Sequence, residues 1–124
     1  MRLLIDSHAL IWWAEASPLL GVAAGNAIAD AANEVLISIA GLWELTIKQS
    51  TGKLTLPVDL EAMVNNLGFT AFAISFVHLN RLERLPHIHR DPFDRMMIAQ
   101  ALAEGFPIAT RDPVFAAYGV QTIW

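Results

Sequence analysis

Four acidic residues are spaced so that they could act together on one metal ion. Asp6 and Asp112 each follow a short apolar run closely. Glu44 lies on the first turns of the helix expected after another run, and Asp94 lies in the first turn of the helix that leads into the run before Asp112. Parallel strands end at one edge of a sheet, where α/β proteins bind their ligands. We therefore expect the four carboxylates to meet at that edge.

Carboxylates brought so close together would repel one another. At ~4 Å and an effective dielectric constant of ~20, each like pair costs about 4 kcal/mol, and a cation would remove this cost. Oxygen ligands in a chain without cysteine favour Mg²⁺ or Mn²⁺. Such an ion activates water and stabilises charge on a phosphate, so the acids predict phosphodiester hydrolysis. In this interpretation Asp6, Glu44 and Asp94 bind the metal directly, and Asp112 binds it directly, through water, or holds a second ion.

Each acid also has a purely structural interpretation. Asp6 could cap a helix, Glu44 could be a solvated helix residue, and Asp112 could form a turn before a proline. Asp91 precedes a proline and reads as a helix N-cap, which also places Asp94 in the first turn, where the helix dipole favours acids. The position of all four at one edge favours the metal site.

Several neighbours of these acids are weaker candidates for substrate contacts or for orienting metal ligands. They are the hydroxyl residues Ser7 and Thr110 and the basic residues His8, Lys48, Arg90, Arg95 and Arg111. Ordinary roles as a cap, a packed histidine or a solvated charge stay open for each. His87 and His89 alternate in a Pro-bounded loop and read as surface residues. No Gly-rich phosphate loop and no Gly-x-Ser-x-Gly occurs, so nucleotide hydrolysis and acyl transfer lack support.

The composition predicts a soluble domain with more apolar surface than one core can bury. The chain has 124 residues, a net charge of −4 and 55% apolar residues. No apolar run reaches the ~18–20 residues of a membrane span, and Asp6 falls where a signal peptide needs apolar residues, so we expect a cytoplasmic protein without membrane contact. The excess of apolar residues predicts a homodimer with an apolar interface. It also predicts a separate apolar groove near Trp12, Trp13 and Trp43 that binds a segment of a partner protein.

Short apolar runs alternate with helical patterns and predict one α/β domain over residues 1–124. The expected strands cover residues 3–5, 35–39, 69–74, 107–109 and 120–123. The expected helices cover residues 7–15, 20–32, 40–49, 59–68, 76–85 and 91–105, with Ser7 capping the first. Strands that are apolar on both faces indicate a mostly parallel central sheet of four to five strands with helices on both sides.

At these residues the chain resembles the PIN-domain family, specifically the VapC-type toxins of toxin–antitoxin pairs. The matching segments lie at residues 3–12, 37–48, 89–101 and 109–112, in the family's order. The resemblance implies a three-layer PIN-like fold and a Mg²⁺- or Mn²⁺-dependent endoribonuclease, usually a homodimer, that a cognate antitoxin inhibits.

The resemblance also implies which acids hold the metal. Transferred residue by residue, they are Asp6, Glu44, Asp94 and Asp112. Asp94 is chosen over Asp91 because the family's acid stands four residues before an Ile-Ala-x-Ala stretch, which begins here at residue 98. The family often has Thr after the first Asp, and the Ser found here keeps the hydroxyl.

Three other interpretations fit less well. A phosphatase of the haloacid dehalogenase type needs Asp-x-Asp after the first strand, and His8 stands in the third place. A receiver-like acidic pocket needs an Asp after the third strand, where the chain has Ser75. A non-catalytic PIN-like binding module is the remaining alternative, although such a scaffold would usually lack one of the four acids. The sequence leaves the target RNA and the antitoxin open.

Overall fold

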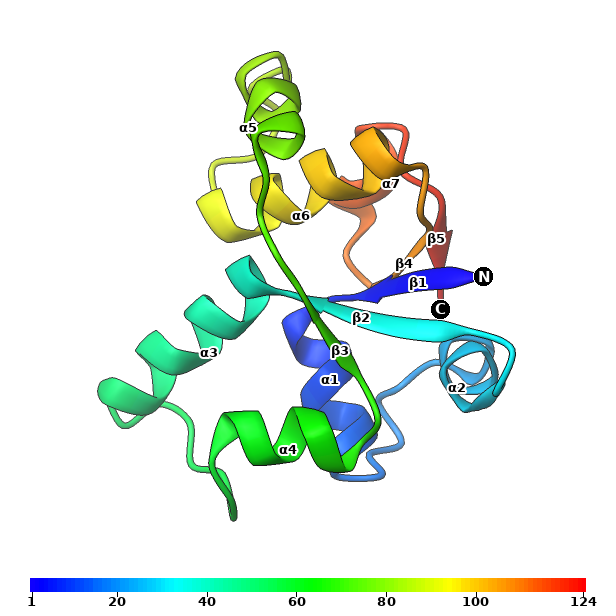
Figure 1. Ribbon diagram of the computed structural model, residues 1–124, viewed down its shortest axis with the longest axis vertical. Helices are drawn as coiled ribbons and strands as arrows, with labels where there is room; N and C mark the ends of the chain where they lie inside the picture. The colour runs from blue at the N-terminus through cyan, green and yellow to red at the C-terminus, as the bar shows by residue number, and fades with distance from the viewer.

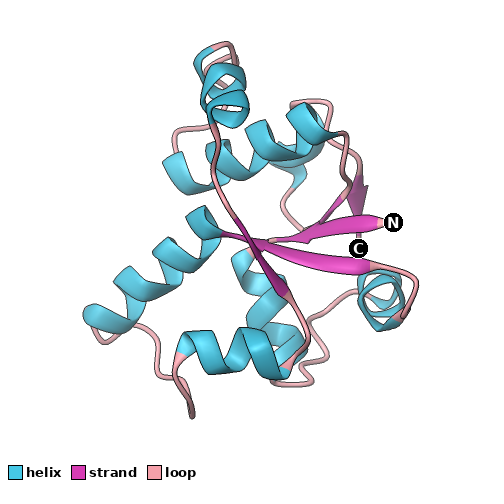
Figure 2. Ribbon diagram, viewed as in Figure 1, coloured by secondary structure: helices cyan, strands magenta, loops and turns pink.

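The computed structural model describes residues 1–124 as a sheet of five strands between two layers of helices (Figures 1 and 2). The elements in chain order are β1 (Arg2–Ile5), α1 (Ser7–Ala14), α2 (Val22–Ala29), β2 (Glu34–Ser38), α3 (Ile39–Ser50), α4 (Leu60–Asn66), β3 (Thr70–Phe72), α5 (Phe76–Glu83), α6 (Pro92–Glu104), β4 (Ile108–Ala109), α7 (Pro113–Ala117) and β5 (Thr122–Ile123). Every pair of neighbouring strands is parallel. The expected three-layer α/β fold is confirmed, with a sheet that is parallel throughout. No helix has both the length and the apolar character that crossing a membrane would require.

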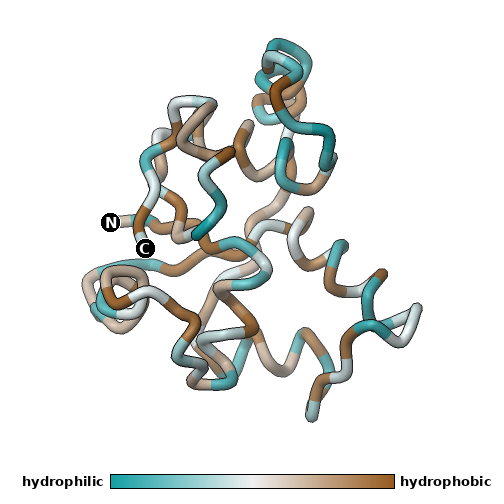
Figure 3. Tube along the Cα trace, turned by 180° about the vertical axis from the view of Figure 1, so that it is seen from behind, coloured by the Kyte–Doolittle hydropathy of each residue, from teal (hydrophilic) through white to brown (hydrophobic).

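Both faces of the sheet are buried, which explains why its strands read as continuous apolar runs. Leu3 and Ile5 of β1 face one core cluster, which α1, α2 and α4 cover. Leu4 faces the opposite cluster, beneath α6 and α7. Figure 3 shows hydrophobic residues along the central strands and hydrophilic residues alternating with them on the outer helices.

The strand order β3-β2-β1-β4-β5 places a topological switch point beside β1. From β1 the chain runs outward through β2 and β3 on one side, and later returns to build β4 and β5 on the other. In such sheets a crevice opens beyond the carboxyl ends of the two strands where the direction reverses. Ile5 and Ala109 are paired at those ends, so the residues that follow them, Asp6 and Thr110, lie at the crevice.

The structure differs from the sequence-based expectations mainly at helix starts. Asp6, not Ser7, caps α1, because its Oδ1 accepts the backbone N–H of Ala9 at 2.8 Å. The expected turn at Asp112 is also the start of a helix, since its Oδ1 accepts the N–H of Val114 at 3.0 Å and α7 follows. Asp91 caps α6 as expected, and α6 ends at Gly105, whose φ of 72° suits a residue without a side chain.

Candidate active site

The carboxyl ends of β1 and β4 open into a small acidic pocket with a volume of about 100 Å³. It receives side chains from α1, α3, α6 and the start of α7. Its lining residues are Asp6, Ser7, His8, Glu44, Asp91, Asp94, Asp112 and Phe115. The structure therefore brings together all four acids that the sequence singled out, and adds Asp91 to them.

Asp6 is held by hydrogen bonds on both of its carboxylate oxygens. Oδ1 accepts the N–H of Ala9, and Oδ2 accepts the hydroxyl of Thr110 at 2.6 Å. The side chain is nearly enclosed, with 8% of the residue exposed. Burial raises the pKa of Asp6 above its usual value, and the hydrogen bonds from Thr110 and Ala9 work in the opposite direction. A buried carboxylate of this kind is a strong site for a cation.

Glu44 reaches the pocket from α3 and is oriented by Ser7. The Ser7 hydroxyl donates to Glu44 Oε1 at 2.8 Å, which ties α1 to α3. The two helices can approach because residue 41 is glycine. A Cβ there would lie 3.2 Å from Ser7 Oγ and 3.3 Å from Ile37 Cδ1. The other oxygen of Glu44 is left for a ligand, since a carboxylate has more acceptor sites than one hydroxyl occupies.

Asp94 forms the opposite side of the pocket from the first turn of α6. Its Oδ2 lies 2.9 Å from Nε2 of His89. The pKa of Asp94 is raised to about 6, chiefly because burial disfavours its charge, with smaller contributions in the same direction from Asp91 and Glu44. The hydrogen bond from His89 lowers the pKa only in part. Sequence reasoning placed His89 on the surface, and the loop in fact folds it back onto the site.

The loop that carries His89 is fixed by Tyr118. The phenol oxygen of Tyr118 accepts the backbone N–H groups of Ile88 at 3.0 Å and of His89 at 2.9 Å. The Arg95 guanidinium donates to the same oxygen at 2.9 Å and to the carbonyl of Pro86 at 2.9 Å. Arg95 therefore holds this loop and does not point at the carboxylates.

Comparison with known proteins identifies the family to which this fold belongs. The family model described as the PIN domain matches residues 3–121. The chain belongs to the PIN-domain family. Its sequence is also 28% identical over 116 residues to Ribonuclease VapC22 of Mycobacterium tuberculosis, an alignment that covers 88% of this chain and 85% of that relative. Among solved structures, a chain in the crystal structure of VapBC2 from Rickettsia felis bound to a DNA fragment from their promoter matches with a TM-score of 0.74 at 14% identity, and the alignment covers all of both chains.

The acidic pocket of this PIN domain fits a hard divalent cation. Its donors are carboxylate oxygens, and no thiolate is present. His89, Asp94 and Asp112 each offer one ligand atom within 4.8 Å of the others, and this tighter set does not include Asp6 or Glu44. Burial is the main cause of the raised pKa values of Asp6 and Asp94, and neighbouring carboxylates add to it, so a bound cation would favour the charged forms of both groups.

Not every residue that sequence reasoning selected reaches the acidic pocket of the PIN domain. Lys48 lies one turn beyond Glu44 on α3, outside the pocket lining. Trp12 and Trp13 line an apolar cavity of about 500 Å³ against α2. Trp43 lies elsewhere, edge-on to the ring of Phe93 at a centroid distance of 5.1 Å. The three tryptophans therefore do not share one groove.

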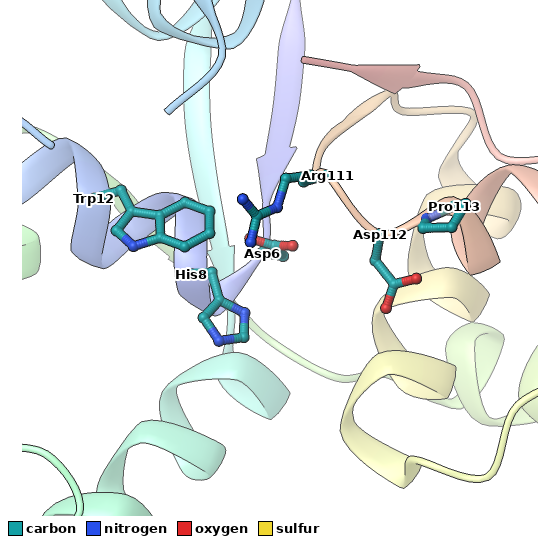
Figure 4. A pocket seen from close by; sticks show the side chains of 6 residues that line it. All are labelled: Asp6, His8, Trp12, Arg111, Asp112 and Pro113. Carbon is teal, nitrogen blue, oxygen red and sulfur yellow. The ribbon is translucent and has the colours of Figure 1, made fainter. Parts of the chain in front are cut away.

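A second pocket adjoins the acidic one on the α1 side of the PIN domain (Figure 4). Its volume is about 310 Å³, and we call it the Arg111–Trp12 pocket. It shares Asp6, His8 and Asp112 with the acidic pocket. Its other lining residues are Trp12, Arg111 and Pro113.

Proposed function

We propose that this PIN domain is an endoribonuclease that depends on Mg²⁺ or Mn²⁺. The observation that carries the proposal is the convergence of Asp6, Glu44, Asp94 and Asp112 on one pocket at the switch point of the sheet. The similarity to a relative named as a ribonuclease supports RNA as the substrate. The acids argue against a binding module that has lost catalysis, because such a module has no reason to keep four repelling charges together.

Asp6, Glu44 and Asp94 would hold the ion directly, and Asp112 would bind it directly, bind it through water, or hold a second ion. Once bound, the ion would supply an activated water and would stabilise charge on the phosphate. The protein's own contribution is orientation. Thr110 fixes Asp6, Ser7 fixes Glu44 and His89 fixes Asp94. Such supporting hydrogen bonds commonly matter almost as much as the ligands themselves.

The direct test is incubation of the purified protein with a panel of structured and unstructured RNAs. Each RNA is incubated with Mg²⁺, with Mn²⁺ or with EDTA, and the products are mapped at nucleotide resolution. We expect internal cleavage with either ion and none with EDTA. Asp6→Asn, purified in parallel, controls for a contaminating nuclease. Equal cleavage by wild type and Asp6→Asn would refute the proposal.

We further propose that the enzyme is a toxin that a cognate antitoxin neutralises. The similarity to VapC22 and the fold shared with a chain of VapBC2 support this role. The cavity lined by Trp12 and Trp13 adjoins the Arg111–Trp12 pocket, since Trp12 lines both, and that pocket in turn shares a wall with the acidic pocket. An amphipathic antitoxin helix in that cavity could direct an Arg or Lys at the carboxylates and displace the metal.

Co-expression with the adjacent reading frame tests this role. We expect a stable complex whose ribonuclease activity is suppressed and returns when the partner is removed. If activity stays suppressed after every basic residue is removed from the bound segment, metal displacement is refuted, but binding of the segment to the cavity lined by Trp12 and Trp13 is not. A partner that binds without reducing cleavage would refute the antitoxin role.

We also propose that the protein is a homodimer. The support is an exposed apolar face on α5, where Phe76 is 83% and Val77 59% exposed. A monomer would present this face to water at considerable cost. Light scattering at tens of micromolar should give twice the mass of one chain, and Phe76→Glu should give a monomer. A wild-type monomer would refute the proposal.

A further inference from the structure

The Arg111–Trp12 pocket is lined by aromatic rings and a guanidinium group as well as by carboxylates. The Arg111 guanidinium carbon lies over the Trp12 ring, 4.8 Å from its centre, so the two side chains form a cation–π pair. The His8 ring lies 5.4 Å from Trp12 at an interplanar angle of 30°. Trp124 supports the Trp12 ring edge-on, with the centroids 5.7 Å apart. The indole is therefore fixed before any ligand arrives.

Arg111 carries the only Arg or Lys charge among the residues that line this pocket and the acidic pocket. It belongs to none of the ion pairs of the structure, which are Arg2–Glu34, His78–Glu104 and His89–Asp94. Its guanidinium donors are thus free to reach a ligand. A single unpaired cation beside a cluster of acids suits a substrate that is anionic and must still approach those acids.

The position of the pocket defines which part of a substrate it can meet. Asp6, His8 and Asp112 belong to both pockets, so the two share a wall. Figure 4 shows Arg111 beside Trp12 and next to Asp6, with His8 close by, so a base would stack on the open side of this contacting pair. A phosphodiester at the carboxylates would therefore have one of its two flanking nucleotides at the Arg111–Trp12 pocket.

We propose that the Arg111–Trp12 pocket binds the base of an unpaired nucleotide that flanks the phosphate to be cleaved. This inference rests on the proposed ribonuclease function and deepens it, because it makes Trp12 and Arg111 substrate-binding residues. Proteins that read single-stranded RNA stack bases on aromatic rings and on arginine planes, and both surfaces are present here. A base-paired nucleotide cannot enter such a pocket, so this flanking nucleotide has to be unpaired when it binds.

The first experiment measures binding without cleavage. Nucleoside 5′-monophosphates contain no internucleotide bond, and ribose 5-phosphate is the matched probe without a base. With Mg²⁺ present, we expect the nucleotides to quench tryptophan fluorescence and ribose 5-phosphate to leave it unchanged. Trp12→Leu should remove the quenching and weaken binding in calorimetry about tenfold, in line with the loss of one stacked base. Trp12→Phe should retain most of the affinity.

The second experiment measures coupling during cleavage. A short RNA with one mapped cleavage site is compared with versions that carry an abasic residue on either side of that site. We expect an abasic residue on one side to raise KM about tenfold, and Arg111→Ala to raise KM similarly on the intact RNA but little on that abasic RNA. Arg84→Ala, a surface change at the residue that follows α5 and outside both pockets, should leave KM unchanged on every substrate.

The outcomes separate the two proposals. If the wild type cleaves RNA but abasic residues on both sides are tolerated, or if Arg111→Ala harms intact and abasic RNA equally, the base pocket is refuted and the nuclease stands. If no RNA is cleaved yet nucleotides quench Trp12, the base pocket stands and the proposed function is refuted. If ribose 5-phosphate binds as well as the nucleotides do, the pocket is a phosphate site and the proposal is overturned.

Discussion

The two sides of the acidic pocket hold their carboxylates by different means. On the sheet side, Asp6 is engaged on both oxygens by donors of the β4 end and of α1. On the α6 side, Asp94 is engaged by one imidazole from a loop. The sheet side is therefore set by the fold itself, whereas the α6 side depends on a loop that the side chains of Tyr118 and Arg95 hold in place. If the pocket binds a metal ion as proposed, the position of Asp6 is fixed by the fold, and the position of Asp94 depends on the contacts of this loop.

The largest expected effect comes from removing one charge on either side. Asp6→Asn and Asp94→Asn should each lower the rate of RNA cleavage by about 10³-fold or more, as losses of transition-state charge stabilisation do. The measurement is single-turnover cleavage at saturating Mg²⁺. Both asparagines keep the size of the side chain, so the circular dichroism spectrum should not change.

Asp91→Asn is the matched control for Asp94. Its Oδ1 accepts the backbone N–H groups of Phe93 and Asp94, and an asparagine oxygen can do the same. We expect it to lose far less activity than Asp94→Asn. An active Asp94→Asn protein beside an inactive Asp91→Asn protein would show that the wrong acid of the pair was chosen.

Divalent ions should stabilise the folded protein through the same carboxylates. At a hundredfold excess over Kd, binding to the native state alone contributes roughly 2.7 kcal/mol. Thermal melting with Mg²⁺, Mn²⁺ and Ca²⁺ should therefore show a rise in Tm for the wild type and a much smaller one for Asp6→Asn. The same rise in both proteins would mean that the four acids are not the metal site.

Thr110→Val tests the rigid side of the pocket. The change removes the 2.6 Å hydrogen bond to Asp6 and the acceptor for the N–H of Asp112 at 3.1 Å. Supporting residues of this kind commonly contribute 10–100-fold to activity or metal affinity, and we expect a loss in that range. Thr110→Ser keeps the hydroxyl and should recover most of the activity. A fully active Thr110→Val protein would show that the fold positions Asp6 without this bond.

Both sides of the pocket could be predicted from the sequence, but to different degrees. The apolar runs place Asp6 and Asp112 after parallel strands, and that was enough to predict that they meet. Asp91 and Asp112 carry the same Asp-Pro signal for a helix start. The signal was recognised before the long α6 and missed before α7, whose five residues are too short to show a periodic pattern.

The loop contacts could not be predicted, because they depend on the three-dimensional path of the chain. His89 lies only five residues from Asp94, yet its approach requires Tyr118, which lies almost thirty residues away. Nothing in the local sequence indicates that hydrogen bond. Arg95 was selected for its charge, and its use in the same loop network was equally invisible.

The pH dependence of stability tests the α6 side of the pocket. The pKa of Asp94 rises from 3.8 in an ordinary environment to about 6 in the fold, so the folded chain binds this proton more tightly than the unfolded chain. Below about pH 4 the raised pKa of Asp94 does not change the free energy of unfolding. The free energy of unfolding then falls between pH 4 and pH 6, and the full loss is reached above pH 6. Two pKa units correspond to at most about 3 kcal/mol, and because the side chain is 20% exposed we expect about 1–2 kcal/mol.

The measurement is urea unfolding of the metal-free protein at several pH values between 4 and 7. Between these limits the wild type should lose stability relative to Asp94→Asn, which has no proton to release at this position. The two proteins are compared by the slope of the free energy of unfolding against pH. A change in stability that is the same at every pH, such as a weaker hydrogen bond to His89, does not alter this slope. Parallel curves would mean that Asp94 titrates normally, and the α6 side would then be as solvated as an open surface.

The smallest expected effect comes from Tyr118→Phe, which loosens the loop without touching a carboxylate. The phenol oxygen accepts three donors, from Ile88, His89 and Arg95, and phenylalanine offers none of these bonds. Since the donors are partly exposed and can turn to water, we expect a loss of about 1 kcal/mol in the free energy of unfolding. Cleavage should fall only a few-fold, because His89 would visit Asp94 less often while Asp6 stays in place. Hydrogen exchange should quicken at the amides of Ile88 and His89 and stay unchanged at the amide of Ala9, which Asp6 holds on the rigid side. Unchanged exchange in the loop would show that Tyr118 does not fix it, and the contrast between the two sides of the pocket would then be lost.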